Sequence, residues 1–325
     1  MTGATGFIGR HVVQHLLQRG HEVVALVRRP EACGLPAAVT VVPGDLGQLD
    51  AWAGHLPQVD AVLHLAASYR IGVVGRRERD AMAATNVAGT AAVLAAAVAA
   101  QVPHIVHVSS TAALGETHGQ LGDEGWRHNG VFRSFYEQTK HVAHGVAVDW
   151  QRRGAPVSVA VPGGVFGEGD GSDLALALRD FVAGRLPLQV ACHSRFQLCH
   201  VSQVCDGLVR VLERGEAGRH YLLTGELVSL AELLSRAAQQ LGLAVPRAVP
   251  REKLQWLAAL GDGLRPLGVR LPLTREALAV MDGSSYTYGS ARAATELGWP
   301  WQAACAQFWP AFDAYIAGLH RAARA

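Results

Sequence analysis

The chain has 325 residues, half of them hydrophobic, which is enough to bury one large core or two linked cores. Its 29 Lys and Arg residues nearly balance 27 Asp and Glu residues, and the formal net charge is +2. This balance gives no reason to expect a nucleic-acid partner or an anionic membrane surface. The five cysteines include no CxxC pair, which favours reduced thiols in the cytoplasm and argues against a metal site.

The longest apolar run, residues 87–100, is rich in alanine. It is shorter than the roughly 20 residues that a membrane-spanning helix needs. We therefore expect a packed helix there, in a cytoplasmic protein with no membrane partner.

Three glycines spaced three residues apart form the first motif. Gly3, Gly6 and Gly9 lie in the run TGATGFIG, and apolar residues at helical spacing follow over residues 10–19. Glycine lets a backbone approach a ligand closely, and the first turn of a helix offers free N–H groups and partial positive charge. The motif predicts a phosphate-binding turn before a helix at 7–19. Because the sequence leaves no room for the strand that precedes such a turn, we expect the first strand of the sheet to be truncated at the N-terminus.

Strands and helices alternate through the first half of the chain. The patterns predict strands at 21–27, 39–43, 60–65, 104–109 and 157–162, and helices at 7–19, 47–54, 78–101 and 134–153. This alternation predicts an α/β fold, with a doubly wound parallel sheet of the Rossmann type over residues 1–165.

The pattern changes after Gly163, where glycines gather and the elements become shorter. Helices are predicted at 173–184, 202–213, 229–241, 251–260, 273–280, 290–296 and 303–320. We expect residues 166–325 to form a smaller, mainly helical substrate domain, with a strand near 220–224 that can rejoin the main sheet.

Two further motifs carry acid–base chemistry. Tyr136 and Lys140 are four residues apart, so both lie on one face of the predicted helix. Ser109 and Ser110 end a buried strand, and open α/β sheets bind ligands at the carboxyl ends of their strands. A free tyrosine has a pKa of about 10, and lowering it by three units needs about 4 kcal/mol of added stabilisation of the phenolate. A nearby ammonium supplies part of that, so we expect the pKa of Tyr136 to be lowered.

Together these motifs resemble the extended short-chain dehydrogenase/reductases, the family of NAD-dependent epimerases/dehydratases and dihydroflavonol-reductase-like enzymes. The resemblance covers nearly the whole chain. It rests on TGATGFIG, Gly44-Asp45-Leu46, His64-Leu65-Ala66-Ala67, Asn86-Val87-Ala88-Gly89-Thr90, Val108-Ser109-Ser110 and the pair Tyr136 and Lys140.

The resemblance implies roles for individual residues. Ser110 is expected to hydrogen-bond the substrate oxygen, Tyr136 to exchange a proton with it, and Lys140 to lower the tyrosine pKa and hold the nicotinamide ribose. The residues expected to bind the cofactor, besides Lys140, are Gly3, Thr5, Gly6, Phe7, Ile8, Gly9, Asp45, Leu46, Leu65, Ala66, Ala67, Pro162 and Val165.

The end of the second predicted strand bears on the choice of cofactor. NAD enzymes usually have an acidic residue there, which accepts hydrogen bonds from the ribose. Here Val27 is followed by Arg28 and Arg29. A guanidinium suits a 2′-phosphate and cannot accept from ribose hydroxyls. We therefore expect NADP(H) to be preferred, with Arg28 as the main contact and Arg29 as the second, while NAD(H) stays possible.

Two activities fit the resemblance. Nucleotide-sugar enzymes of the family carry an asparagine where Gly164 stands and an arginine where Phe196 stands, with Arg195 one residue early. These absences favour an NADPH-dependent reductase of a small ketone or aldehyde over a nucleotide-sugar epimerase or dehydratase. A third alternative is an inactive dinucleotide-binding sensor. Family resemblance also suggests a homodimer that packs through the helices at 84–100 and 136–150.

Overall fold

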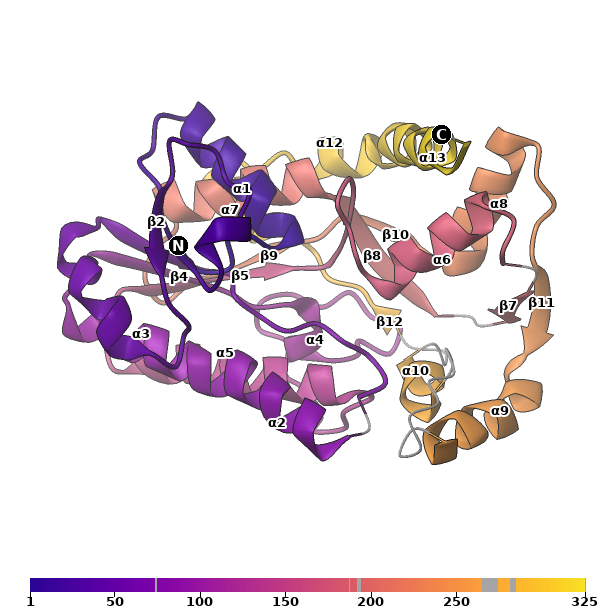
Figure 1. Cartoon of the computed structure of the whole chain (residues 1–325), viewed down its shortest axis with the longest axis horizontal. Helices are drawn as coiled ribbons and strands as arrows, with labels where there is room; N and C mark the ends of the chain where they lie inside the picture. Colours follow the sequence, from indigo (N-terminus) through magenta and orange to yellow (C-terminus); the bar gives the residue numbers. More distant parts are fainter. Residues whose placement is uncertain (74, 187, 192–193, 265–273, 281–284, 325) are drawn as a thin grey trace.

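A parallel β-sheet forms the centre of the computed structural model (Figure 1). The structure describes residues 1–324 with the exception of 74, 187, 192–193, 265–273 and 281–284. The parallel strands are β2 (Thr40–Pro43) beside β1 (Val24–Val27), then β3 (Ala61–His64), β4 (His104–Val108), β5 (Val157–Pro162) and β9 (His220–Leu223). The predicted doubly wound parallel sheet is confirmed, and β9 lies in it beside β5.

Met1 and Thr2 occupy the place between β1 and β3. Thr2 forms parallel β-bridges to both Leu26 and His64. The Leu26 N–H donates to the Met1 carbonyl at 2.9 Å, and the Thr2 N–H donates to the Leu63 carbonyl at 3.0 Å. The two parts of the sheet are therefore joined by isolated bridges directly before the glycine turn.

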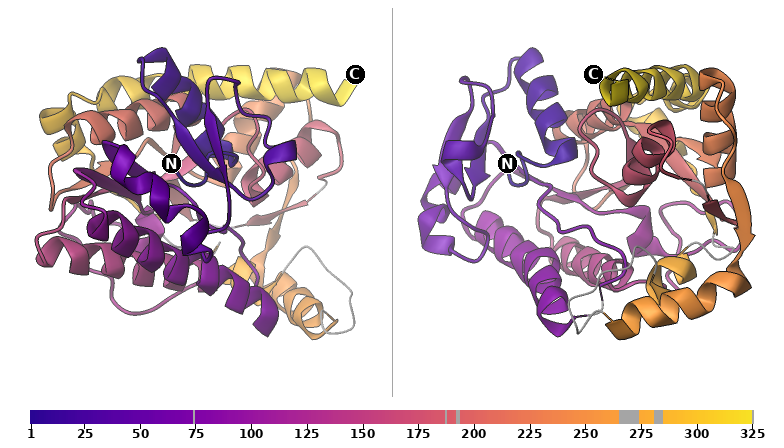
Figure 2. Two further views of the ribbon diagram at one scale, coloured as in Figure 1. Left: turned by 60° about the vertical axis from the view of Figure 1, so that its left-hand side comes forward. Right: turned by 45° about the vertical axis from the view of Figure 1, so that its right-hand side comes forward.

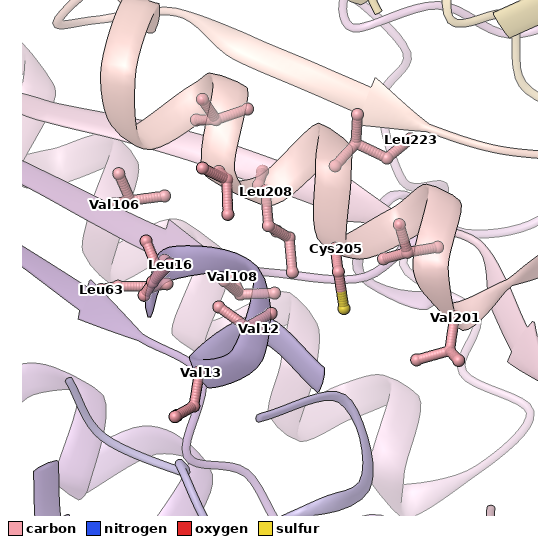
Figure 3. Packing of buried hydrophobic residues seen from close by; sticks show 14 of the residues in the cluster. Val12, Val13, Leu16, Leu63, Val106, Val108, Val201, Cys205, Leu208 and Leu223 are labelled. Atoms are coloured by element: carbon pink, nitrogen blue, oxygen red, sulfur yellow. The ribbon is translucent and has the colours of Figure 1, made fainter. Parts of the chain in front are cut away.

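Helices cover both faces of this sheet (Figures 1 and 2). One face carries α1 (Phe7–Gln18) and α7 (Val201–Arg214), and the other carries α3 (Gly89–Ala99) and α5 (Phe135–Arg152). Figure 3 shows Leu16 of α1 and Leu208 of α7 in one buried cluster with Leu63 and Val106 of the strands. These apolar contacts fix where α1 begins, and so they place the glycine turn at the carboxyl edge of the sheet.

Residues 47–54 do not form the predicted α-helix. Two 3₁₀ helices, η2 (Leu49–Ala51) and η3 (Ala53–Gln58), cover most of this stretch and extend beyond it. η3 contains Gly54 and Pro57, which both disfavour a continuous α-helix. The apolar residues whose spacing suggested an α-helix lie here on the tighter turns of the 3₁₀ helices.

The helix predicted at 78–101 begins earlier and contains a wider turn. α2 (Arg76–Ala83), a π-helical turn η4 (Ala84–Ala88) and α3 form one run of 24 residues. By length and composition this run is the one candidate membrane span among the described residues. The expectation that the apolar segment is too short to cross a membrane is therefore wrong. In this fold the run is a core helix, because Val93 and Leu94 are buried against the sheet.

The C-terminal half contains short strands in addition to the predicted helices. β8 (Arg195–His200) pairs with β6 (Gly164–Phe166), β10 (Glu226–Val228) and β12 (Ser285–Tyr286), while β7 (Leu188–Ala191) pairs with β11 (Arg247–Pro250). The helices are α6 (Asp173–Val182), α8 (Leu230–Leu241), α9 (Arg251–Leu264), α10 (Arg275–Val280), α11 (Ala291–Leu297), α12 (Trp301–Ala306) and α13 (Phe308–Arg324). Position 273, where one helix was predicted to begin, lies outside the described residues. The helix predicted at 303–320 is divided at Gln307.

Candidate active site

The glycine turn has a geometry that only glycine allows. Gly3 has a φ of +74°, and a Cβ atom built there would lie 2.7 Å from the backbone nitrogen of Ala66. A Cβ atom on Gly9 would lie 2.0 Å from the Gly3 carbonyl oxygen. The turn is closed by the Gly6 N–H, which donates to the Gly3 carbonyl at 3.0 Å. The predicted spacing of the glycines therefore reflects close contacts between backbone segments.

The first turn of α1 is open to a ligand. Gly6 is its N-cap and provides no side-chain cap, and the first turn holds no acidic residue. Thr5, Phe7 and Ile8 flank this point, and Thr5 is exposed. Free N–H groups and the positive end of the helix dipole at such a terminus favour a phosphate group.

A shallow pocket lies at the ends of β1 and β2. It is lined by Arg28, Pro43, Gly44, Asp45, Gln48 and Ala51. The Arg28 Nε lies 3.9 Å from Asp45 Oδ2, and the two side chains are 77% and 51% exposed. Leu46 points away from this rim towards α3, where it approaches Gly89. Arg29 does not line the pocket.

The loop after β3 follows the glycine turn closely. The Ala66 N–H donates to Thr2 Oγ1 at 3.2 Å, which places Leu65, Ala66 and Ala67 beside the turn. Pro162 ends β5 and Val165 lies in β6, at the same carboxyl edge of the sheet. The structure thus brings the residues predicted to bind the cofactor to one edge of the sheet.

Ser110, Tyr136 and Lys140 meet at the end of β4. Ser110 is the N-cap of α4 (Thr111–Leu114), where its Oγ accepts the Ala112 N–H at 3.2 Å. The Tyr136 side chain is hydrogen-bonded to Ser110. Lys140, only 4% exposed, donates from Nζ to the Val108 carbonyl at 3.0 Å. The three residues predicted to be catalytic therefore lie together.

The pKa of Tyr136 differs from the expectation. Burial raises it to about 12, and the hydrogen bond to Ser110 opposes this rise without reversing it. Burial also lowers the pKa of the Lys140 ammonium to about 8. The expected lowering of the tyrosine pKa by Lys140 is therefore wrong for the protein alone, in which the loss of water around the phenol sets the direction of the shift.

Asn86 links the loop after β3 to the catalytic helix. Its Oδ1 accepts the Ser68 N–H at 2.6 Å, and its Nδ2 donates to the Ser68 carbonyl at 3.0 Å and to Thr139 Oγ1 at 2.9 Å. In the sequence, Asn86 stands out only as the first residue of the motif Asn86-Val87-Ala88-Gly89-Thr90, which does not indicate its role. The bonds show that it ties the loop to α5, one residue before Lys140.

Three further residues surround Tyr136: Tyr69, which the sequence places in a loop near the site without indicating a role, and Glu137 and Glu276, which no sequence motif singles out. The ring of Tyr69 meets the ring of Tyr136 edge-on, with centroids 4.8 Å apart, and remains 50% exposed. The carboxylates of Glu137 and Glu276 accept the backbone N–H groups of Arg133 and Phe135, which both precede Tyr136 in the chain. A polar residue next to the predicted catalytic tyrosine was a usable signal for Glu137, whereas nothing local pointed to Glu276.

The geometry fits a nicotinamide dinucleotide. The tight glycine turn leads directly into the uncapped start of α1, which offers N–H donors to a diphosphate. The pocket at Arg28 and Asp45 lies at the strand ends where an adenosine would be held. Among the described residues, no group of three or more His, Cys, Asp or Glu side chains could hold a metal ion.

Comparison with known proteins agrees with this geometry. The model of the NAD dependent epimerase/dehydratase family matches residues 1–224. A Synechocystis protein provisionally named dihydroflavonol 4-reductase is 30% identical over 92% of this chain and 89% of its own length. A Stigmatella aurantiaca protein, named 4-hydroxy-2-methyl-3-oxo-4-farnesyl-3,4-dihydroquinoline-1-oxide ketoreductase, is 31% identical over 92% of this chain and 90% of its own length.

Solved structures match along the full length. The crystal structure of gox2253 superposes with a TM-score of 0.80 at 28% identity and covers 99% of this chain and 98% of its own. A nucleoside-diphosphate-sugar epimerase from Pseudomonas aeruginosa superposes with a TM-score of 0.78 at 25% identity, covering 98% and 96% of the two chains. The fold is therefore shared along its full length with both of these solved structures, one of which is a nucleoside-diphosphate-sugar epimerase.

The buried ammonium of Lys140 predicts a stability that depends on pH. The pKa of this ammonium is about 8 in the folded protein, compared with an ordinary value of 10.5. Between these two pH values the unfolded chain holds more protons than the folded protein, so the folded state gains stability as the pH rises. Lys140→Met should therefore stabilise the protein most at pH 7, by about 3 kcal/mol at most, and less at pH 10. Urea unfolding of both proteins at the two pH values measures this, and an equal difference at both would contradict it.

Proposed function

Because this chain belongs to the NAD-dependent epimerase/dehydratase family of extended short-chain dehydrogenases/reductases, we propose that it is an NADPH-dependent reductase of ketones or aldehydes. The observation that carries the proposal is the meeting of Ser110, Tyr136 and Lys140 at the carboxyl end of β4. We assign cofactor binding to residues 1–165 and the substrate pocket mainly to residues 166–325.

The raised pKa of Tyr136 suits a proton donor. At neutral pH a phenol with a pKa of about 12 carries its proton, which it can pass to the oxygen of a carbonyl group as that oxygen gains negative charge. Ser110 donates a hydrogen bond to the same oxygen and holds it beside Tyr136. Lys140, protonated at neutral pH, stabilises the phenolate left behind. A bound nicotinamide cofactor supplies the hydride.

Two contacts favour an uncharged substrate over a nucleotide sugar. A Cβ atom on Gly164 would lie 2.9 Å from the Gln197 carbonyl oxygen, so this backbone has no room for the asparagine that sugar enzymes of the family carry there. Arg195 donates to the Leu227 carbonyl at 2.9 Å and lies 3.4 Å from Glu232. These contacts argue against a second diphosphate-binding site formed by Gly164 and Arg195.

The pocket wall and the relatives point the same way. The half-exposed ring of Tyr69 offers an apolar surface next to Tyr136. One relative is named a ketoreductase of a farnesyl dihydroquinoline oxide, and another, from Mycolicibacterium neoaurum, is named a 3-beta-hydroxysteroid dehydrogenase. We therefore propose an apolar, ring-containing carbonyl compound as the substrate class.

Substitution of Tyr136 by phenylalanine tests the reaction. Loss of the proton donor should lower kcat by a factor on the order of 10² to 10⁴, because general acid catalysis contributes about that much. NADPH oxidation against a panel of ketones, aldehydes and nucleotide sugars measures it. One NADPH consumed per product formed supports the reductase, whereas conversion of a nucleotide sugar without net consumption supports an epimerase. Equal rates for the native protein and Tyr136→Phe would refute the mechanism.

The same site favours NADP(H) over NAD(H). Arg28 lines the pocket at the end of β1, and its guanidinium can pair with a 2′-phosphate but cannot accept from a ribose hydroxyl. We expect NADPH to bind more tightly than NADH. Arg28→Gln should reduce this preference about tenfold or more, because a hydrogen bond to a charged group is worth roughly 1.5–3 kcal/mol. Arg29→Gln, outside the pocket, should have a smaller effect. Fluorescence titration gives both dissociation constants, and equal values in the native protein would exclude this cofactor preference.

We also propose a cytoplasmic homodimer packed through α3 and α5. α3 consists largely of alanine, which allows a second helix to approach closely, and Val142 of α5 is 44% exposed. Light scattering at micromolar concentration should give twice the mass of the 34.4 kDa chain, and the monomer mass would rule the dimer out.

A further inference from the structure

The first turn of α5 is held on both sides of Tyr136. The residue before it, Phe135, donates its backbone N–H to Glu276 Oε1 at 2.6 Å. The residue after it, Glu137, has its N–H bound by Ser134 Oγ at 3.1 Å. The N–H groups in the first turn of a helix have no partners within the helix, so such contacts decide how firmly the turn is held.

Glu137 is a buried carboxylate with three hydrogen-bond donors around it. It is 3% exposed, and its Oε2 accepts the Arg133 N–H at 2.6 Å. Its Oε1 lies 3.3 Å from both the Tyr286 hydroxyl and His128 Nε2. The Gly130 N–H donates to His128 Nδ1 at 2.9 Å, so the proton of the neutral ring is on Nε2 and points to Glu137.

These donors come from two distant parts of the chain. Arg133 and His128 lie in the segment between α4 and α5, which flanks the proposed substrate pocket. Tyr286 lies in β12 of the C-terminal half. Glu137 therefore fastens the pocket segment and β12 to the helix turn that carries Tyr136.

Glu276 makes the matching contact from α10 (Figure 1). The Phe135 N–H donates to it, and backbone groups of Val73 and Gly72 lie close enough to favour its charged form, so one carboxylate faces both the start of α5 and the loop that follows β3. Arg133 Nη1 donates to the Ala279 carbonyl at 3.1 Å, which is a second contact between α10 and the segment before α5. α10 thus packs against both the start of α5 and the loop that follows β3, next to Tyr136.

We propose that Glu137 and Glu276 are positioning residues that clamp the first turn of α5 and so hold the Tyr136 hydroxyl beside Ser110. The inference rests on the proposed role of Tyr136 as proton donor. Removing either carboxylate leaves buried N–H or O–H donors unpaired, and the turn then shifts to satisfy them. A shift of about 1 Å at a reacting group can cost up to about 100-fold in rate.

Steady-state kinetics at saturating NADPH test the clamp. Glu137→Ala and Glu276→Ala should each lower kcat on the order of 10- to 100-fold, while the dissociation constant of NADPH changes less than about twofold. Glu276→Gln should recover most of kcat, because its amide oxygen still accepts the Phe135 N–H. In a Tyr136→Phe background, Glu276→Ala should cost little more, since the group being positioned is gone.

Glu232→Ala is the matched control. Glu232 accepts the Ser229 N–H at 2.6 Å at the start of α8, a helix that carries no proposed site residue. Its loss should lower stability without changing kcat. If Glu137→Ala does not fold, the Glu276 variants decide the question. A kcat within twofold of native in folded Glu276→Ala overturns the clamp, and equal rates for the native protein and Tyr136→Phe overturn the proposed function instead.

Discussion

One chain of buried hydrogen bonds connects the glycine turn with the catalytic helix. Thr2 Oγ1 accepts the Ala66 N–H, so its own proton goes to His64 Nδ1, 2.7 Å away. His64 Nε2 then donates to Thr90 Oγ1 at 3.0 Å, and Thr90 donates to the Asn86 carbonyl at 2.7 Å. Burial lowers the pKa of His64 to about 3, which keeps the ring neutral and the direction of the chain constant. Because the Asn86 side chain in turn binds Thr139 of α5, one continuous network of buried polar groups joins the glycine turn to the helix that carries Tyr136.

The site combines two groups whose surroundings push their pKa values further apart. The Tyr136 phenol is raised to about 12 and the Lys140 ammonium lowered to about 8, both through burial. The phenol therefore gives up its proton only when a stronger base forms beside it. This arrangement is suited to reduction of a carbonyl group, in which negative charge develops on the substrate oxygen next to Ser110 and Tyr136.

Local sequence predicted those parts of the fold that depend on local physics. The glycine turn, the strands of the parallel sheet and the Tyr136–Lys140 pair follow from steric limits and from periodicity, and all lie where they were expected. The short strands of the C-terminal half could not be predicted in this way, because β12 has two residues and exists only through its pairing with β8. The pKa of Tyr136 was missed for a similar reason, since it depends on how many distant segments remove water from the phenol.

The contact between Glu276 and Phe135 joins residues 141 positions apart in the chain. Because its two ends are so far apart in the sequence, this contact cannot arise from local folding at the start of α5 and exists only once the C-terminal half has packed against it. The same holds for the core beneath α1, since Ala293, Leu297, Trp299 and Ala304 belong to its buried cluster. The geometry of the proposed active site is thus a property of the whole chain rather than of its first half.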